Sequence, residues 1–223
     1  MNVESLDLVN DDYKNRMLQF EIDCNDGKGT GYACHSVGEF HAVVNKDHAS
    51  AAKVLELNCD GKNHYGPSCF KLGRLLLTGK GVGQTDAGAE RRFMSACDLG
   101  VTQACHHLGS LLLEGSAEVK RDPERAHKYF SKACEDQDVE SCYFLAKNLL
   151  AGKGTTPRNP PEAQHKLSSS CDLGHAPSCR LLAVMFRNGD TGVLKDDEKY
   201  RSYRQKTEEL VRQRGAMMGV QVA

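Results

Sequence analysis

Ten cysteines carry the most evident chemistry in this sequence of 223 residues. Taken in chain order they form five pairs, separated by 10, 10, 8, 8 and 8 residues, and the first members recur after 35, 38, 37 and 37 residues. An even number of regularly spaced cysteines is typical of a disulfide framework. The spacing therefore predicts five disulfides between neighbours in the sequence: Cys24–Cys34, Cys59–Cys69, Cys97–Cys105, Cys134–Cys142 and Cys171–Cys179.

Other chemistry for these cysteines stays open. Five pairs of buried free thiols are one alternative, because a reduced cysteine packs as a small core residue. Zinc is a weaker one, because zinc-binding cysteines usually stand two to four residues apart and no two cysteines here are that close. Redox couples are usually C-x-x-C motifs. If one pair is redox-active, Cys24–Cys34 is the candidate, because its repeat diverges most from the others.

The cysteines recur with a period of about 37 residues, which is typical of helical arrays. Each period predicts helix A, a loop and helix B. Cys105, Leu108 and Leu112 form one apolar stripe of a helix A, which Gly115 ends. Helix B begins after Asp or Pro, as at Asp122-Pro123. The predicted repeats are 33–66, 68–103, 104–140, 141–177 and 178–214, preceded by a helix over 11–24.

The predicted fold is all-α: about eleven helices in a right-handed α-α superhelix of five repeats stapled by disulfides. It forms one domain over 11–214, with flexible termini at 1–10 and 215–223. Each pair links the end of one helix B to the start of the next helix A. The concave surface of such a solenoid recognises other proteins. Helix A side chains that escape the core are the predicted contacts: Lys71, Arg74, His107, Ser110, Lys147 and Arg180.

Composition argues against some partners. The chain has 29 Lys and Arg against 30 Asp and Glu, which gives no electrostatic reason to expect nucleic acid. No run of 18 apolar residues predicts a membrane span. The segment 1–12 is acidic and contains no Lys or Arg, so it resembles neither a secretory signal nor a matrix presequence.

The repeats resemble Sel-one-like repeats, relatives of tetratricopeptide repeats with an A-x-x-x-LG-x-L-x-x-G-x-G pattern, over roughly Ala33 to Gln213. Cysteine pairs at this phase resemble the disulfide-rich branch, which includes the bacterial Hcp-type proteins and the family of the mitochondrial cytochrome c oxidase assembly factor 7. The segments most similar to the latter family are ASAAKVLELNCD (49–60), SCFKLGRLLLTGKG (68–81) and CDLGHAPSC (171–179).

The resemblance implies a soluble protein of the mitochondrial intermembrane space that helps to build cytochrome c oxidase. Its partners would be protein clients of respiratory-chain assembly and the oxidative import machinery. We expect a binding scaffold and no catalytic residue, metal or cofactor. Two alternatives stay open. One is a disulfide oxidoreductase or haem-handling protein that acts on assembly clients. The other is an exported bacterial-type repeat protein that binds cell-wall fragments.

Three further motifs have structural interpretations. Ser50-Ala-Ala-Lys53 matches the S-x-x-K of penicillin-binding enzymes, but the chain lacks their S-D-N and K-T-G motifs, so a helix start with Ser as cap is the expectation. The glycine-rich stretch 79–83 follows a helix, as a repeat turn does, whereas phosphate loops follow a strand. His106 and His107 point about 100° apart on a helix, so they do not readily face one ion; a haem or copper ligand among the histidines is an alternative.

Overall fold

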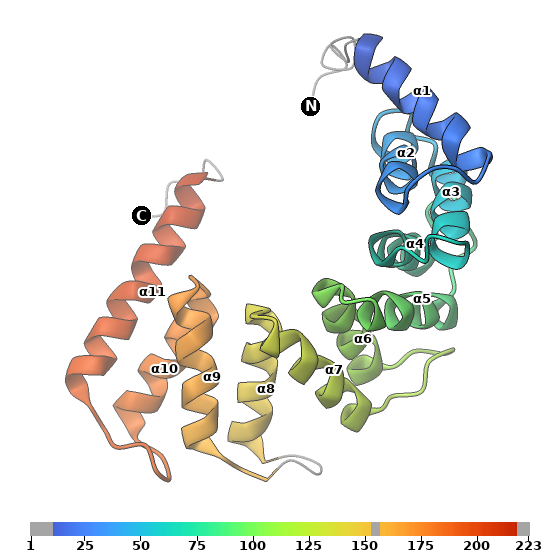
Figure 1. Cartoon of the computed structure of the whole chain (residues 1–223). Coiled ribbons are helices and arrows are strands. Elements are labelled where there is room, and N and C mark those ends of the chain that lie inside the picture. Colours follow the sequence, from blue (N-terminus) through green and yellow to red (C-terminus); the bar gives the residue numbers. More distant parts are fainter. Residues whose placement is uncertain (1–10, 153–156, 218–223) are drawn as a thin grey trace. The chain divides into compact units, whose positions relative to one another are not determined.

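The computed structural model describes residues 11–152 and 157–217. In these residues the chain forms eleven helices and, besides them, an isolated bridge between Asp190 and Val193. The helices are α1 (Asp11–Asn25), α2 (Gly31–Val43), α3 (His48–Asp60), α4 (Gly66–Thr78), α5 (Asp86–Asp98), α6 (Thr102–Glu114), α7 (Pro123–Glu135), α8 (Val139–Ala151), α9 (Pro160–Asp172), α10 (Ala176–Asn188) and α11 (Asp197–Met217). Figure 1 labels them in chain order.

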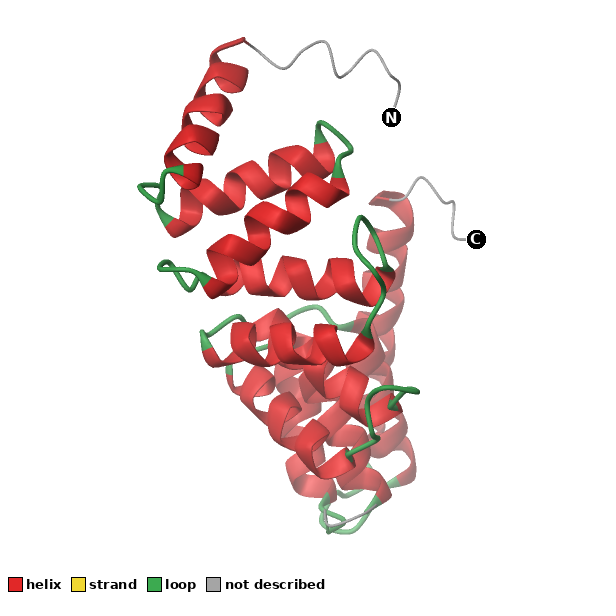
Figure 2. Ribbon diagram, turned by 90° about the vertical axis from the view of Figure 1, so that its right-hand side faces the viewer, coloured by secondary structure: helices red, strands yellow, loops and turns green. Residues whose placement is uncertain are grey.

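The chain divides into two compact units. Unit 1 ends at Arg121 and contains α1 to α6, and unit 2 begins at Asp122 and contains α7 to α11. Within each unit, helices that follow one another in the chain pack together. Figure 2 shows these helices with the loops that connect them. A single domain over 11–214 stays a prediction.

The ends of the helices follow from local sequence. Asp122, Asp138 and Asn159 are N-caps whose side chains accept the backbone N–H of the third residue that follows, which satisfies a donor that the helix leaves open. Prolines stand in the first turn of α7 and α9, where a missing N–H costs nothing. Helices α4 and α8 stop at Gly79 and Gly152 in left-handed conformation, and α6 stops at Gly115, which also has a positive φ.

Each unit has its own apolar core. In unit 1, the fully buried Phe93 of α5 lies against Gly73 of α4, where an added Cβ would stand 2.7 Å from the Phe93 ring. Glycine at this position lets the two helices approach closely. In unit 2, Leu167, Leu182 and Phe186 belong to one cluster of buried residues contributed by α8, α9 and α10. The predicted stripe of Cys105, Leu108 and Leu112 is buried.

All ten cysteines are joined in the pairs that the spacing predicts, with Cα–Cα distances between 4.8 and 5.5 Å. Each disulfide links the last turn of one helix to the first turns of the next, so it crosses a turn and lies within one unit. The pairs join α1 to α2, α3 to α4, α5 to α6, α7 to α8 and α9 to α10.

The last helix extends beyond the predicted last repeat, and the flexibility of the termini stays a prediction. Helix α11 continues to Met217, so residues 215–217 are helical and the last repeat is longer than the predicted end at Arg214. Ala216 and Met217 are good helix formers, which explains the continuation. Residues 1–10 and 218–223 lie outside the described residues.

Candidate functional site

The predicted contact residues belong to two separate groups. Lys71 and Arg74 of α4 and His107 and Ser110 of α6 are in unit 1, and Lys147 of α8 and Arg180 of α10 are in unit 2. All six lie on the first helix of a repeat, as predicted. Whether any of them contacts a partner stays a prediction.

Two of these cations cover aromatic rings one helical turn before them. The Arg74 guanidinium lies 6.0 Å from the centre of the Phe70 ring, and the Lys147 ammonium lies 5.5 Å from the centre of the Tyr143 ring. The spacing of four residues places each pair on one face of its helix. A cation over an exposed ring contributes about 0.5–1 kcal/mol. Each cation therefore adds one contact to a half-buried aromatic side chain that also packs against other rings.

Two other predicted contacts interact within unit 1. Lys71 forms an ion pair with Glu39 of α2 at 2.8 Å. The His107 ring is stacked on Phe93, with the ring centres 5.5 Å apart. These interactions make Lys71 and His107 less available to a partner than Arg180, which is exposed, whereas Ser110 is half-buried.

The S-x-x-K motif is part of a helix, but Ser50 is not its cap. The N-cap of α3 is Asp47, whose carboxylate accepts the N–H groups of Ala49 and Ser50. Hydrogen bonds from Ser50 lower the pKa of Asp47. The expectation of Ser50 as cap was wrong because Asp47 reaches the same N–H groups from the position before the helix. Lys53 is exposed.

The glycine-rich stretch 79–83 forms the turn between α4 and α5, as predicted. An added Cβ on Gly81 would stand 2.3 Å from the backbone of His48, so this turn packs against the start of α3 and leaves no room there for a phosphate. The related turn begins at Gly152, and Lys153 and Gly154 of that stretch lie outside the described residues.

Histidines do not gather into a metal-binding group. The rings of His106 and His107 lie edge to face, with centres 5.8 Å apart. Within residues 11–152 and 157–217, no three or more His, Cys, Asp or Glu side chains lie so as to hold a metal ion. Burial lowers the pKa of His35, whose Nδ1 lies 3.1 Å from the Ser68 hydroxyl. In the same residues, no helix is long and apolar enough to cross a membrane.

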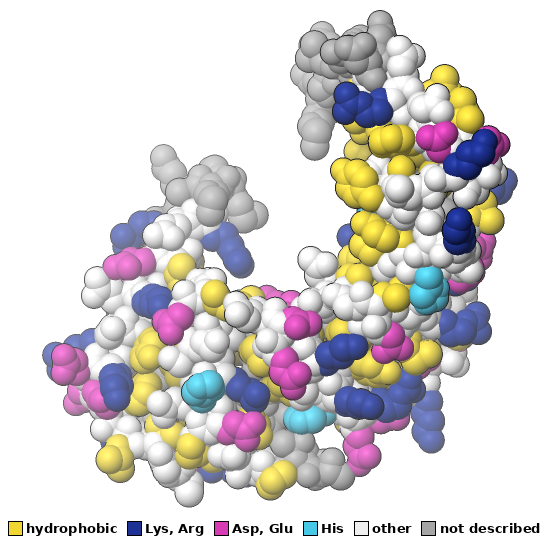
Figure 3. Space-filling view, in the orientation of Figure 1, with side chains coloured by type: hydrophobic (Ala, Val, Ile, Leu, Met, Phe, Trp, Pro, Cys, Tyr) yellow, Lys and Arg dark blue, Asp and Glu magenta, His cyan; other side chains and the backbone are white. Residues whose placement is uncertain are grey.

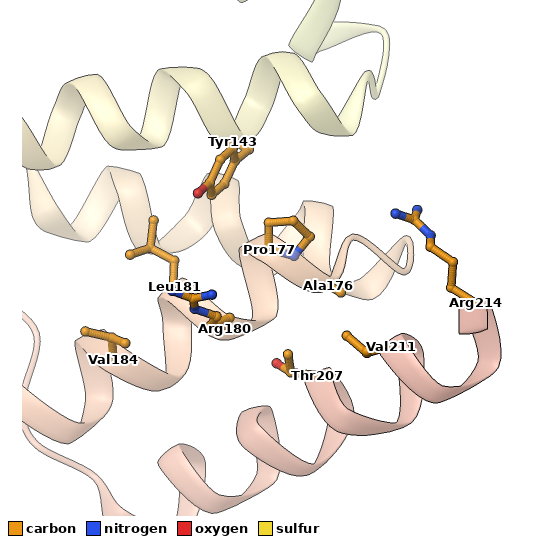
Figure 4. Close-up of a pocket in the computed structure, with 9 residues that line it drawn as sticks. All are labelled: Tyr143, Ala176, Pro177, Arg180, Leu181, Val184, Thr207, Val211 and Arg214. Atoms are coloured by element: carbon orange, nitrogen blue, oxygen red, sulfur yellow. The ribbon is translucent and has the colours of Figure 1, made fainter. Parts of the chain in front are cut away.

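Unit 2 contains an open groove of about 400 Å³ between α8, α10 and α11, which we call the α10–α11 groove. Figure 4 shows Tyr143 of α8 on one side, Pro177 and Leu181 of α10 in the middle, and Val211 of α11 opposite. Val184 of α10 and Val211 of α11 are 44% and 48% exposed, and both line the groove beside other apolar side chains. The groove is therefore lined mainly by apolar surface.

The charges at the α10–α11 groove are all positive. Arg180 and Arg214 line it, and neither forms an ion pair with a residue that the structure describes. Some other cations of unit 2 are paired with carboxylates. Arg158, for example, donates two hydrogen bonds to the Asp190 carboxylate, at 2.7 and 2.6 Å, and these bonds lower the pKa of Asp190.

A second groove, of about 270 Å³, lies in unit 1 beside the Cys24–Cys34 disulfide, and we call it the disulfide groove. Its other lining residues include Val54 and Leu57 of α3, and Leu57 is 69% exposed. Asn63 Nδ2 lies 4.0 Å from Cys34 Sγ. Figure 3 shows hydrophobic side chains along the α1 and α2 part of unit 1. The exposed ones of those helices are Tyr13, Leu18, Ile22, Tyr32 and Val43.

Sequence reasoning singled out Arg180 but missed Tyr143, Val184, Val211 and Arg214. One signal was available. The helix pattern after Asp197 continues for 21 residues, whereas α2 to α10 have 13 each. The extra length contains an apolar residue and a cation at Val211 and Arg214, which line the α10–α11 groove.

Four segments of the chain match the family model described as the Sel1 repeat: 66–88, 102–138, 139–175 and 176–199. Among solved structures, the Sel1 repeat protein from Oxalobacter formigenes aligns with a TM-score of 0.73 and 16% identity, over 80% of this chain and 73% of that one. The protein c5321 of uropathogenic Escherichia coli, described as displaying an SLR fold, aligns with a TM-score of 0.50 and 19% identity, over 88% and 49%. Both likenesses concern the fold.

Curated relatives carry the name cytochrome c oxidase assembly factor 7. The protein of Homo sapiens is 31% identical over 122 residues, which is 50% of this chain and 51% of that protein. The protein of Xenopus tropicalis is 34% identical over 101 residues, which is 43% of each. The match thus spans about half the length of these relatives. Because the repeat model matches more than half of the sequence, this chain belongs to the Sel1 repeat family.

Proposed function

We propose that this protein takes part in the assembly of cytochrome c oxidase as a protein-binding scaffold, and that it works in the mitochondrial intermembrane space. The observation that carries the proposal is the 31–34% identity to relatives named cytochrome c oxidase assembly factor 7. That identity extends over about half of each relative.

A scaffold role fits the architecture. Helix pairs in a repeat array bury one face and leave side chains of the first helix exposed, which provides contact area for other proteins. Arg74 is exposed and lies over an aromatic ring, and Arg and aromatic residues are both enriched at protein interfaces. The expected partners are protein clients of respiratory-chain assembly.

The disulfides support the choice of compartment. Disulfides form and persist in oxidising compartments and are rare in the cytosol. The mitochondrial intermembrane space oxidises imported proteins, so the oxidative import machinery is the second expected partner. Non-reducing mass spectrometry of the protein from its own cells, after fractionation and protease protection, tests this. We expect five bridges and no free thiol in the intermembrane-space fraction. Reduced protein in the cytosol would contradict the location.

Complementation tests the role. In cells whose own copy of the gene is disrupted, we expect lower levels of assembled cytochrome c oxidase on native gels and slower oxygen consumption. The wild-type chain should restore both. Arg201→Glu changes an exposed position of α11 outside the α10–α11 groove. As a control variant, it should restore oxidase levels and oxygen consumption as well as the wild-type chain does. Normal levels of the oxidase in the disrupted cells would contradict the proposal.

A disulfide oxidoreductase is a second candidate function, which the disulfide groove favours. Cys24 is half-buried and lines that groove, whereas Cys171 and Cys179 are fully buried. A client dithiol would attack the Cys24–Cys34 bond, form a mixed disulfide as one protein thiolate leaves, and then close its own disulfide as the second thiolate leaves. The chain would keep the dithiol. Reduction of a test disulfide by the dithiol form, lost in Cys24→Ser and kept in Cys171→Ser, would support this function. A Soret band on addition of haem tests the haem-handling form of this candidate.

A further inference from the structure

The long last helix is the structural reason for the α10–α11 groove. A helix of 13 residues, the length of α2 to α10, would end α11 at Glu209, so Val211 and Arg214 lie in its additional part. Residues 207, 211 and 214 follow a helical spacing and face the groove together. Figure 4 shows the side chains of Thr207 and Val211 directed from α11 toward α10. The extension thus adds a second wall to the exposed face of α10.

The first wall has the same periodicity. Pro177, Leu181 and Val184 form a stripe along α10 that spans about 10 Å at 1.5 Å per residue. That length equals about two turns of a helix. The groove therefore has the dimensions to receive two or three apolar side chains of an incoming helix, spaced three and four residues apart.

The charges at the rim determine which helix fits. Arg180 and Arg214 are exposed on the two walls and lack a carboxylate partner among the described residues. Lys147 lies over the Tyr143 ring and likewise forms no ion pair with a described residue. Not one of the groove's lining residues in the described part of the chain is acidic. A partner with carboxylates beside its apolar stripe would pair with these cations, whereas a basic partner would be repelled.

We propose that the α10–α11 groove binds an acidic amphipathic helix of another protein, whose apolar side chains enter between Leu181, Val184 and Val211 and whose carboxylates pair with Arg180 and Arg214. This inference rests on the proposed function, because it assumes that the chain acts by binding proteins. It adds the site and the chemical class of the bound segment. Because the attraction is partly between exposed charges, the affinity should fall as salt is raised.

The test uses the full, oxidised chain and a fluorescein-labelled synthetic peptide of about 16 residues, long enough to form a helix on binding. The peptide carries Leu at i, i+3, i+4 and i+7 and Glu at the flanking positions. Two control peptides replace either the Glu residues by Lys or the Leu residues by Ser. Fluorescence anisotropy at physiological salt measures the dissociation constants. We expect the acidic peptide to bind, and both controls to bind at least about tenfold more weakly.

Charge reversal locates the site. Arg180→Glu with Arg214→Glu should weaken binding of the acidic peptide at least about tenfold. The matched control is Arg201→Glu with Arg212→Glu, which changes the net charge by the same amount at exposed positions of α11 outside the groove, and should weaken binding less than about threefold because of screening. Circular dichroism of each variant establishes that it is folded, and Val211→Asp, which changes one wall without touching either arginine, should also weaken binding.

Three results would overturn the proposal: no binding of the acidic peptide, equal weakening by the two charge-reversal pairs, or self-association of the chain that the Arg180→Glu, Arg214→Glu variant abolishes. The last result would assign the groove to a second copy. Each of these outcomes is distinguishable from failure of the proposed function, because complementation by the wild-type chain is measured separately.

Discussion

The two N-terminal disulfides close turns two residues longer than those of the three C-terminal disulfides, and one of these long turns, after Cys59, is held differently from the short turns. In the short turns the backbone makes the bonds. After Cys97, for example, the Gly100 N–H donates to the Cys97 carbonyl and the Val101 N–H donates to the Ala96 carbonyl. The same two bonds recur after Cys134 and Cys171, and also in the longer turn after Cys24.

The long turn after Cys59 combines backbone bonds, such as that from the Tyr65 N–H to the Asn58 carbonyl, with a network of side-chain bonds. The Asn58 amide, buried beside the disulfide, donates to the Gly31 carbonyl at 2.8 Å and to the Ser68 hydroxyl at 2.7 Å. The Asn63 amide donates to the Asn58 side chain at 2.9 Å and to the Gly29 carbonyl at 3.1 Å. The extra turn residues thus make a polar network that also reaches the turn closed by the first disulfide.

Turns closed by the same kind of disulfide can therefore satisfy the hydrogen bonds of their polar groups in two ways. A short turn satisfies them locally and needs only one residue in left-handed conformation, which is Gly100, Gln137 or Gly174 in the three copies. The turn after Cys59 also uses the side-chain amides of Asn58 and Asn63. Substitutions should therefore act at different positions in the two regions.

Reduction of all five disulfides should have the largest effect on stability, because both kinds of turn are closed by a disulfide. Closing a loop of about ten residues contributes ~2–3 kcal/mol in the chain-entropy model, so five bridges together rival the stability of a typical domain. We expect complete reduction to lower the melting temperature strongly or to unfold the chain at room temperature. Circular dichroism with and without a phosphine reductant measures this, and an unchanged melting temperature after full reduction contradicts it.

Core substitutions check that the two regions differ in their turns and not in their packing. Phe93 in unit 1 and Phe130 in unit 2 are both fully buried at the same place in their repeats. Replacing either by Ala should lower the free energy of unfolding by about 3–5 kcal/mol. Urea denaturation of the two variants measures the losses. A clear inequality would mean that packing also distinguishes the regions.

Asn58→Ala breaks the polar network of the long turn. The position before the first cysteine is Asn58 there and Ala96 or Ala133 in two of the short turns, so Ala is sterically acceptable at this position. Ser68 and Asn63 would each lose their hydrogen bond to the Asn58 side chain. We therefore expect a loss of about 1–3 kcal/mol in the free energy of unfolding. The reciprocal variant Ala96→Asn places an amide where no network exists. If Asn58→Ala leaves stability unchanged, side chains do not hold the long turn.

The smallest effects concern the left-handed residue of the short turns. Gly174 has a φ of 85° and Gln137, at the same place, has a φ of 64°. A residue with a side chain is disfavoured in this conformation by roughly 1–2 kcal/mol. Gly174→Ala should therefore lower the free energy of unfolding, and Gln137→Gly should raise it, by about 1 kcal/mol each. Changes of opposite sign in the melting temperatures of the two variants support the interpretation, and changes of the same sign contradict it.

Local features were predictable from the sequence because each is decided within a few residues. The cysteine pairs follow from helix ends separated by a short turn, and the helix stops at Gly79 and Gly152 follow from the left-handed conformation that glycine favours. The cap of α3 was misassigned because Asp47 and Ser50 are both good capping residues, and only the structure shows which one precedes the helix.

The candidate groove was less predictable because it depends on three helices. Arg180 could be placed on the exposed face of its helix from the repeat pattern alone. Its neighbour Arg214 lies 34 positions later in the chain, and only the packing of α11 on α10 brings both arginines to one groove. In the same way, the stacking of His107 on Phe93 joins two helices and leaves half-buried a ring that the sequence suggested as a contact.

The short span of every disulfide also favours the correct pairing of cysteines when the chain is oxidised. Each correct bridge closes a loop of 8 or 10 residues, whereas the nearest wrong bridge between adjacent pairs, Cys34 to Cys59, would close a loop of 25. In the unfolded chain, the shorter loop is favoured by roughly 1 kcal/mol of closure entropy. A bridge can therefore form as soon as its helical hairpin does, and at the proposed location this can happen while the remainder of the chain is still crossing a membrane pore. Stapling one hairpin after another would make passage effectively one-way, because an oxidised hairpin is wider than an extended chain.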